Sequence, residues 1–251
     1  MKTKILAIFA CLLWGSAFAG AKIGFEYTTP LHLSGMRFML AGLLLIPFLI
    51  YQKIDWISNL KEWRYMLLFG FLQTFIQYGF FFMGLNKVPA AISAIIIGGG
   101  PFFVAVMAHF TMGNDRMSFR KILAIVLGMA GIVFISFAKG GSIHTDISFY
   151  YGVILLIISN IVGASTNIIV AKNRNKVSPV MLTAFANFSG GLILYIVSFF
   201  TEDWYVKPYS LEFYIAWIWL ALIPAVGFSI WYSLLKRPEV KVSELNMWKF
   251  V

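Results

Sequence analysis

The sequence predicts an all-α integral membrane protein, a polytopic helix bundle of two inverted five-helix repeats. Three observations predict it: an apolar composition, apolar runs of membrane-spanning length, and a weak internal repeat whose loops exchange charge. Of the 251 residues, 60% are hydrophobic, 18% are aromatic and only 12% are charged, with a mean hydropathy of +0.83. A soluble globule of this size needs more polar side chains to cover its surface. The chain is therefore built for a lipid bilayer.

The apolar runs give the expected helices, since a spanning helix needs about 20 mostly apolar residues. They lie at residues 5–25, 31–51, 65–85, 90–110, 120–138, 150–171, 179–200 and 213–235. A ninth run begins near Val242 and reaches Val251, which is about 10 residues, or half of a bilayer core. The first run resembles a secretory signal peptide, but because it stays apolar as far as Phe25 we expect a retained helix.

The basic residues collect in loops on one side of these runs. One set of alternate loops holds Lys2, Lys4, Lys53, Lys61, Arg64, Arg116, Arg120, Lys121, Lys172, Arg174, Lys176, Lys236, Arg237 and Lys241. The opposite loops hold only Lys22, Lys87, Lys139 and Lys207. Lys and Arg are retained on the cytoplasmic side, so the pattern predicts a cytoplasmic N-terminus. It also explains the net charge of +10 without a nucleic-acid partner.

An internal repeat emerges when the chain is displaced by about 150 positions. Segment 28–48 then lies on segment 177–197, which pairs Pro30 with Pro179 and Gly42 with Gly191. Because each unit has an odd number of spans, the second unit must be inverted in the membrane, and matched loops should differ in basic residues. They do so, which predicts a first five-helix repeat at 1–138 and a second, inverted repeat at 148–251.

The same offset predicts that the second repeat is incomplete. Val251 corresponds to Pro101, in the middle of the fourth run, whereas the first repeat continues to Ala138. A complete second copy would extend to about residue 288. We therefore expect eight full spans and part of a ninth.

Several short motifs occur in an order typical of one family. They are Trp14-Gly15-Ser16, Pro30, Arg37, the run YGFFFMGLNKVPAAISAIIIGGGPFF at 78–103, and Gly128 with Gly131. Over its whole length the chain resembles the drug/metabolite transporter superfamily, and within it the EamA-type ten-helix permeases. The fourth span of that family closes with Gly-Glu, where this chain has Gly113-Asn114-Asp115. We interpret Asp115 as a displaced substitute for that glutamate, and we carry no role over to it.

The resemblance implies a transporter (permease or exporter) of small metabolites such as amino acids, or of drug-like organic compounds, by alternating access. The expected location is the cell membrane, with the bacterial cytoplasmic membrane favoured. The alternatives are an inactive truncated fragment of such a transporter and a membrane-embedded enzyme or receptor that uses the same bundle. The expected partners are a small-molecule solute and the lipid bilayer, and a homodimer is a separate hypothesis about assembly. No zinc-binding helix, phosphate-binding loop or nucleophile-base pair is recognisable, so we expect no catalytic residues, metal or cofactor.

Arg37 is the first candidate for contact with the solute, since a charge inside a span is by default a functional hypothesis. The alternative is an anchor whose long side chain reaches the surface and pairs with Glu26. Lys249 has the same two interpretations, as a second charge of the site or as a surface anchor.

The remaining candidates are polar and aromatic. The side chains expected to line the cavity with Arg37 are Trp14, Ser16, Gln77, Tyr78, Asn160 and Asn167. Most of the other aromatic residues, Phe75, Trp217, Trp219, Trp231 and Tyr232, are assigned to lipid-facing or interfacial positions. Gly99, Gly100 and Pro101 predict a helix break, with packing or a kink favoured over direct substrate contact.

Overall fold

The computed structural model describes residues 2–138, 146–203, 205 and 207–250 of the chain. Every regular element within these residues is helical. The elements are α1 (Lys2–Phe25), α2 (Pro30–Leu44), α3 (Ile46–Tyr51), α4 (Trp56–Leu60), α5 (Trp63–Gly70), η1 (Phe71–Gln77), α6 (Tyr78–Lys87), α7 (Ala90–Gly98), α8 (Gly100–Thr111), α9 (Phe119–Ala138), α10 (Ile147–Lys172), α11 (Pro179–Thr201), α12 (Leu211–Leu235), α13 (Val242–Met247) and η2 (Trp248–Phe250). The predictions for Lys139 and Val251 fall outside the described residues.

Within the described residues, seven helical stretches are long and apolar enough to cross a membrane. They are Thr3–Phe25, Pro30–Tyr51, Trp63–Lys87, Ala90–Thr111, Ile147–Lys172, Pro179–Thr201 and Leu211–Leu235. The helix α9 occupies the remaining predicted run at 120–138. The chain is thus a polytopic membrane helix bundle, as its composition predicts.

Small polar residues and prolines fix where the long helices begin. The side chains of Asp146, Ser178 and Ser210 accept hydrogen bonds from the backbone N–H groups three residues later. These caps satisfy donors that would otherwise lack partners at a helix start. Pro30 and Pro179 occupy the first helical position, where a missing N–H costs nothing.

The outer surface of the bundle is apolar. Phe110, Phe200, Ile147 and Leu211 are each more than three-quarters exposed, and other large apolar side chains accompany them along the outward helix faces. So many exposed large apolar side chains are unusual for a soluble monomer. We expect lipid acyl chains to contact this surface.

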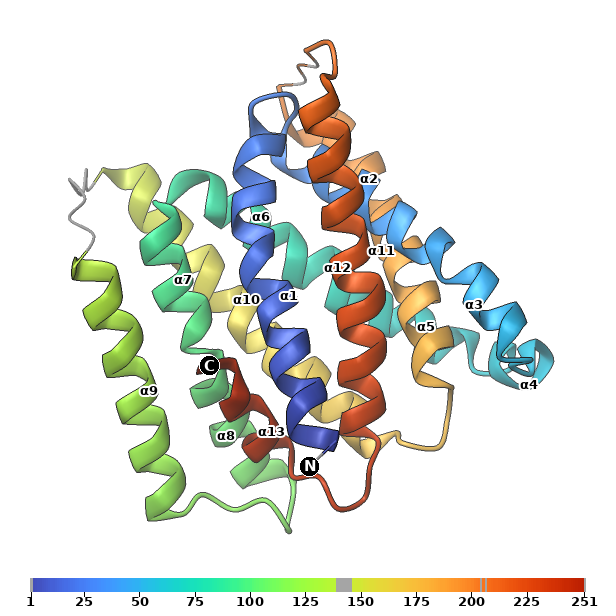
Figure 1. Ribbon diagram of the computed structural model, residues 1–251, viewed down its shortest axis with the longest axis vertical. Coiled ribbons are helices and arrows are strands. Elements are labelled where there is room, and N and C mark those ends of the chain that lie inside the picture. Colours follow the sequence, from blue (N-terminus) through green and yellow to red (C-terminus); the bar gives the residue numbers. More distant parts are fainter. Residues whose placement is uncertain (1, 139–145, 204, 206, 251) are drawn as a thin grey trace.

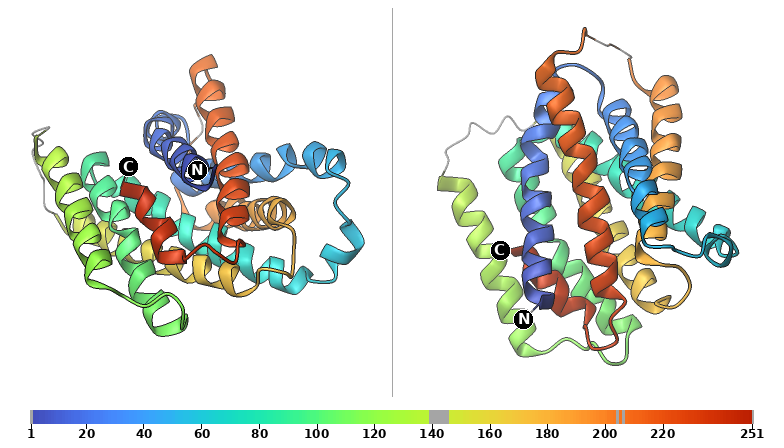
Figure 2. Two further views of the ribbon diagram at one scale, coloured as in Figure 1. Left: turned by 60° about the horizontal axis from the view of Figure 1, so that its bottom comes forward. Right: turned by 45° about the vertical axis from the view of Figure 1, so that its right-hand side comes forward.

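The long helices pair in a regular way. α1 runs beside α12, α2 beside α11, and α10 packs against α6 and α8 (Figure 1). The helix α9 lies at the margin of the bundle beside α7, and the C-terminal turn folds inward toward α1 (Figures 1 and 2). The candidate site lies between these helices.

The contact between α2 and α11 is a glycine seam with a reciprocal pattern. A Cβ on Gly42 would lie 2.7 Å from the Ala184 carbonyl oxygen and 2.8 Å from the Phe188 nitrogen. A Cβ on Gly191 would lie 2.8 Å from the Met39 nitrogen and 3.1 Å from the Gly35 carbonyl oxygen. Under an offset of about 150 positions these two contact sets exchange, as in an interface with two-fold symmetry.

Two of the spanning stretches are irregular near their middle. Between α5 and α6 the backbone forms a π-helix over Phe71–Gln77. Between α7 and α8 the helix stops at Gly99, whose N–H bonds to the carbonyls of Ile95 and Ile96. Interruptions of this kind often accompany functional sites in membrane helices.

Candidate functional site

A cavity of about 620 Å³ lies in the centre of the bundle. Its walls come from α1, α2, η1, α6, α7, α8, α10, α12 and the C-terminal turn. This volume is within the range of about 300 to 1,000 Å³ that is usual for small-molecule sites. The two irregular helical stretches both border it, through Gln73 and Gln77 on one side and Gly98 and Gly100 on the other.

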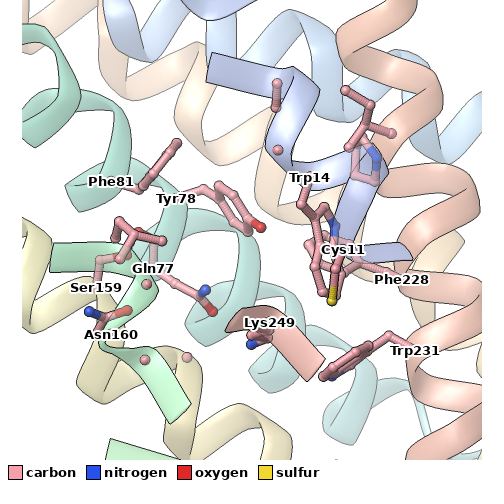
Figure 3. A pocket seen from close by; sticks show the side chains of 18 of the residues that line it. Cys11, Trp14, Gln77, Tyr78, Phe81, Ser159, Asn160, Phe228, Trp231 and Lys249 are labelled. Atoms are coloured by element: carbon pink, nitrogen blue, oxygen red, sulfur yellow. The ribbon is translucent and has the colours of Figure 1, made fainter. Parts of the chain in front are cut away.

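Most of the residues singled out in the sequence gather here. The lining includes Trp14, Arg37, Gln77, Tyr78, Gly100, Asn160 and Asn167. Figure 3 shows Lys249 entering the cavity, with Gln77 and Tyr78 to one side and Trp14 and Trp231 to the other. Residues from both halves of the chain therefore face one space.

Ser16 is placed elsewhere. Its hydroxyl donates to the Leu13 carbonyl at 2.7 Å and accepts from the Trp219 indole N–H at 3.0 Å, in a shallow hollow between α1 and α12. The reason is helix geometry: at about 100° per residue, positions 14 and 16 face nearly opposite directions. Within the Trp-Gly-Ser motif, Trp14 therefore lines the cavity and Ser16 lies on the outer face of α1.

Arg37 is buried, with 3% of its surface exposed. Its guanidinium carbon lies 4.3 Å from the ring centroid of Phe38 and 4.5 Å from that of Phe82, close enough for cation–π attraction. Its Nε has no hydrogen-bond partner, and no ion pair joins it to any described acid. The interpretation of Arg37 as a surface anchor paired with Glu26 is therefore wrong for this conformation.

Lys249 is the second cation of the cavity. Its ammonium nitrogen lies 5.1 Å from the ring centroid of Trp231 and 5.5 Å from that of Trp14. The turn η2 places it there, because α13 directs the end of the chain inward between α1 and α8. The interpretation of Lys249 as a surface anchor is also wrong for this conformation.

Asn160 connects α10 to the broken helix. Its amide nitrogen donates to the Ile96 carbonyl at 2.6 Å, one turn before the break at Gly99. A Cβ on Gly100 would lie 3.1 Å from the Asn160 side-chain oxygen, so the glycine gives this amide room. Asn160 thus lines the cavity and gives the Ile96 carbonyl, which also accepts from the Gly99 N–H, a second hydrogen bond beside the break.

Asn167 holds one wall of the cavity in place. Its side-chain oxygen accepts from the Trp231 indole N–H at 2.8 Å, and its amide nitrogen donates to the Gly163 carbonyl at 2.7 Å. The Asn246 amide approaches the same oxygen at 3.4 Å. The contact fixes the indole plane that faces Lys249.

Several polar atoms of the lining have no partner. They are the Gln77 side-chain oxygen, the Trp14 indole nitrogen, the Tyr232 hydroxyl and Arg37 Nε. Buried polar atoms are normally hydrogen-bonded, so these four atoms are available to bind a polar solute in the cavity. Three of the four are hydrogen-bond donors.

Trp231 and Tyr232 are two cavity residues that the sequence pattern assigned to lipid-facing or interfacial positions. Each is at most 2% exposed, and both line the cavity, whereas Trp219 is 42% exposed as expected for a lipid-facing residue. A usable signal existed in the sequence: Phe228, Trp231 and Tyr232 recur at helical spacing and share one face of α12.

Asp115 lies in the loop between α8 and α9, away from the cavity. Its carboxylate is paired with Lys121 at 2.5 Å and accepts from the Ser243 N–H at 2.8 Å and from the Ser243 hydroxyl. Burial alone raises the pKa of this carboxyl, but the bonds from Lys121 and Ser243 outweigh it and hold the pKa below its usual value. Asp115 thus ties the α8–α9 loop to the start of α13.

A multi-pass helix bundle around a central cavity with charged, polar and aromatic walls defines the class of a membrane carrier. The chain belongs to the EamA-like transporter family, whose model matches residues 1–137. It is a membrane transporter and not an enzyme.

Relatives of known sequence agree with this assignment. The chain is 25% identical to the uncharacterized transporter YvbV of Bacillus subtilis, over 95% of this chain and 76% of that protein. It is 29% identical to a probable amino-acid metabolite efflux pump of Escherichia coli, over 53% of this chain and 42% of that protein. A crystal structure superposes with a TM-score of 0.83 at 19% identity, covering 99% of this chain and 83% of that one, which shows a shared fold.

Proposed function

We propose that the protein exports small organic solutes across a cell membrane by alternating access, with the central cavity as the solute site. The observation that carries the proposal is the cavity itself, which is bordered by helices from both halves of the chain and lined with unpartnered polar atoms. The printed name of the Escherichia coli relative, an amino-acid metabolite efflux pump, supports small metabolites as solutes and an outward direction.

The mechanism we propose is a rocking of two inverted units, residues 1–138 and 148–251, about the cavity. Support comes from the glycine seam, where the contacts of Gly42 and Gly191 exchange under the repeat offset. Further support comes from the helix pairs, since the pairing of α1 with α12 corresponds to that of α10 with α6. Rigid-body motion around such an axis exposes one site to each side in turn.

Within the cavity we assign three kinds of role. Arg37 and Gln77 contact the solute directly, and Trp14 and Tyr78 give it apolar surfaces. Asn160 and Asn167 hold the break at Gly99 and the Trp231 ring in place. The break at Gly99, Gly100 and Pro101 lets α8 tilt against α7 during the change of access. Ser16 has no place in this site, because it faces the opposite side of α1.

The orientation we propose has the N-terminus in the cytoplasm. The basic loops that support it include Lys61, Arg64, Lys172 and Arg174, which are found on the same side of the apolar runs. A bacterial cytoplasmic membrane is the favoured location, since several of the matched relatives come from bacteria.

The test is solute flux in proteoliposomes. The purified chain is reconstituted and offered a mixed panel of radiolabelled amino acids, organic acids and cationic dyes, with an internal excess of the same unlabelled solute in parallel vesicles. The proposal expects uptake of at least one solute to rise with internal unlabelled solute, because one cavity serves both sides in turn.

Arg64→Gln is the matched control for Arg37→Gln in this assay, since Arg64 is exposed outside the cavity. Uptake by both Arg64→Gln and wild type, but not by Arg37→Gln, supports the site. Flux that is insensitive to internal solute and to Arg37→Gln would contradict carriage through this cavity.

A further inference from the structure

We propose that the solute is an organic anion, a carboxylate or a comparable single negative group attached to a flat apolar body, and that Arg37 and Lys249 bind its charge. This inference rests on the proposed function, because it names the class of solute for the same cavity. It starts from the charges that the cavity contains.

The cavity lining holds two cations and, among the described residues, no Asp or Glu side chain. Arg37 is on α2, in the first half of the chain, and Lys249 is on η2, at its end. Both side chains line the same cavity, so each makes the electrostatic potential inside it more positive. A low-dielectric cavity with two like charges attracts an anion and repels a cation.

Within the described part of the chain, no Asp or Glu side chain forms an ion pair with these cations. Asp115 is held by Lys121 and Ser243, and Glu202 accepts from the N–H groups of Leu31 and His32 at 2.8 and 3.2 Å. The acids Glu62 and Glu244 pair with lysines at the surface. The remaining acids, Glu26, Asp55, Asp146, Asp203, Glu212 and Glu239, are exposed.

Aromatic rings stabilise the two cations in the absence of an acid. Rings lie over both charges, and a series of ring contacts connects them. The series runs from Trp231 to Trp14 at 4.9 Å, to Phe228 at 5.6 Å, to Tyr78 at 5.8 Å and to Phe38 at 4.8 Å between centroids. Cation–π contacts compensate burial only partly, because they leave the N–H donors unused.

The unused donors complete the case for an anion. Arg37 Nε, Trp14 Nε1 and the Tyr232 hydroxyl are buried without partners, and an arginine presents a planar set of donors that matches a carboxylate. A neutral solute would leave both charges unpaired, and an ammonium group would meet two positive charges. The aromatic walls then select a flat apolar body beside the anionic group.

The test is binding of a matched series to the full chain in lipid nanodiscs, measured by isothermal titration calorimetry. The probes are naphthoate, naphthamide and naphthylmethylammonium, which share one ring system and differ in charge. We expect naphthoate to bind about tenfold tighter than naphthamide, and the ammonium to bind more weakly than either.

Variants separate a charge role from a structural one. Arg37→Gln and Lys249→Gln should each weaken the binding of naphthoate about tenfold, while the affinity for naphthamide should change less than about twofold. Arg37→Lys should retain part of the preference for naphthoate. The exposed residues Arg64 and Lys61 supply the controls Arg64→Gln and Lys61→Gln, which should behave like wild type.

The inference would be overturned if the cavity variants lost equal affinity for naphthoate and naphthamide. It would also be overturned if the wild type bound the ammonium more tightly than naphthoate, or did not bind naphthoate. The proposed function fails separately. If naphthoate binds but no solute of the panel is exchanged across proteoliposomes, transport is wrong and the anion site stands. If a cationic solute is exchanged through the cavity, transport stands and the anion site is wrong.

Discussion

Among the described residues, we compare two sites of charge inside the molecule, one in the α8–α9 loop at Asp115 and one in the central cavity, lined by Arg37 and Lys249. In the loop, the Asp115 carboxylate has a lysine and a serine as partners, and its bonds join two segments far apart in the sequence. In the cavity, aromatic rings cover the cations, and Arg37 Nε has no hydrogen-bond partner. The difference agrees with a structural role for the first charge and with the solute-binding role that we propose for the second.

The largest expected effect is on the structural side of this comparison. Asp115→Ala leaves Lys121 buried without its acid and removes a cap from α13, so we expect a loss of about 3 kcal/mol of stability. Unfolding in detergent, followed by circular dichroism, measures it. The control Asp55→Ala, at the exposed start of α4, should lose no more than about 1 kcal/mol. Similar losses for both variants would contradict a structural role for the Asp115 contacts.

The same contact predicts a pH dependence. Because the folded-state pKa of Asp115 is lowered, its contribution is fully present above the ordinary value of 3.8 and is lost as the pH falls through the folded-state pKa. Wild type should therefore lose more stability than Asp115→Asn between neutral pH and strongly acidic pH. Parallel losses in the two proteins would show that other carboxyls govern acid unfolding.

Arg37→Gln should show the opposite pattern, with a large effect on activity and a small one on stability. We expect exchange of an organic anion to fall by about 10-fold to 100-fold, since a charged hydrogen bond to the solute is lost. The melting temperature should stay within a few degrees or rise, because the variant no longer buries an unpaired charge. A strong fall in melting temperature would place Arg37 with Asp115 as a structural charge.

A smaller effect is expected at the glycine seam, which contains neither charge nor cavity. Gly42→Ala and Gly191→Ala each introduce a Cβ within 3 Å of backbone and should cost about 1 to 3 kcal/mol. If the seam relates two equivalent units, the two costs should agree within about 0.5 kcal/mol. Gly131→Ala, where a Cβ meets nothing within 4 Å, is the control. A loss of stability in only one of the two variants, Gly42→Ala or Gly191→Ala, would contradict the two-fold relation.

The smallest expected effect concerns Asn160. Asn160→Ala removes one hydrogen bond to the Ile96 carbonyl, and interhelical hydrogen bonds in membranes contribute about 0.6 kcal/mol. Stability should therefore change little, while solute exchange should slow several-fold as the break at Gly99 loses its support. Unchanged exchange would limit Asn160 to helix packing.

The sequence predicted the helices well and the site partly. Hydropathy is a local property, so the apolar runs begin and end within about three residues of α1, α10, α11 and α12. Which face of a helix points inward depends on packing partners. For that reason Ser16 was expected in the cavity, and Trp231 was assigned to the lipid, although both follow simple helical geometry.

Other features of the site arise from tertiary structure alone. The π-helix before Tyr78 has no signal in FLQTFIQ, and the inward fold of η2 depends on the contact of α13 with α8 and α10. The lack of an ion pair at Arg37 could be predicted from the lack of acids in the apolar runs. Its contact with aromatic rings could not be predicted, because it depends on where folding places Phe38 and Phe82.

The measurement that tests the central claim most directly uses Cys11, the single cysteine of the chain, which lines the cavity. Cys11 is treated with an anionic reagent, sulfonatoethyl methanethiosulfonate, and a cationic one, trimethylammonioethyl methanethiosulfonate, and each rate is divided by that of a free thiol in solution. We predict that the anionic reagent is favoured about tenfold and that Arg37→Gln and Lys249→Gln remove the preference. A preference for the cationic reagent, or one unchanged by both substitutions, would contradict a cavity whose unpaired cations select anions.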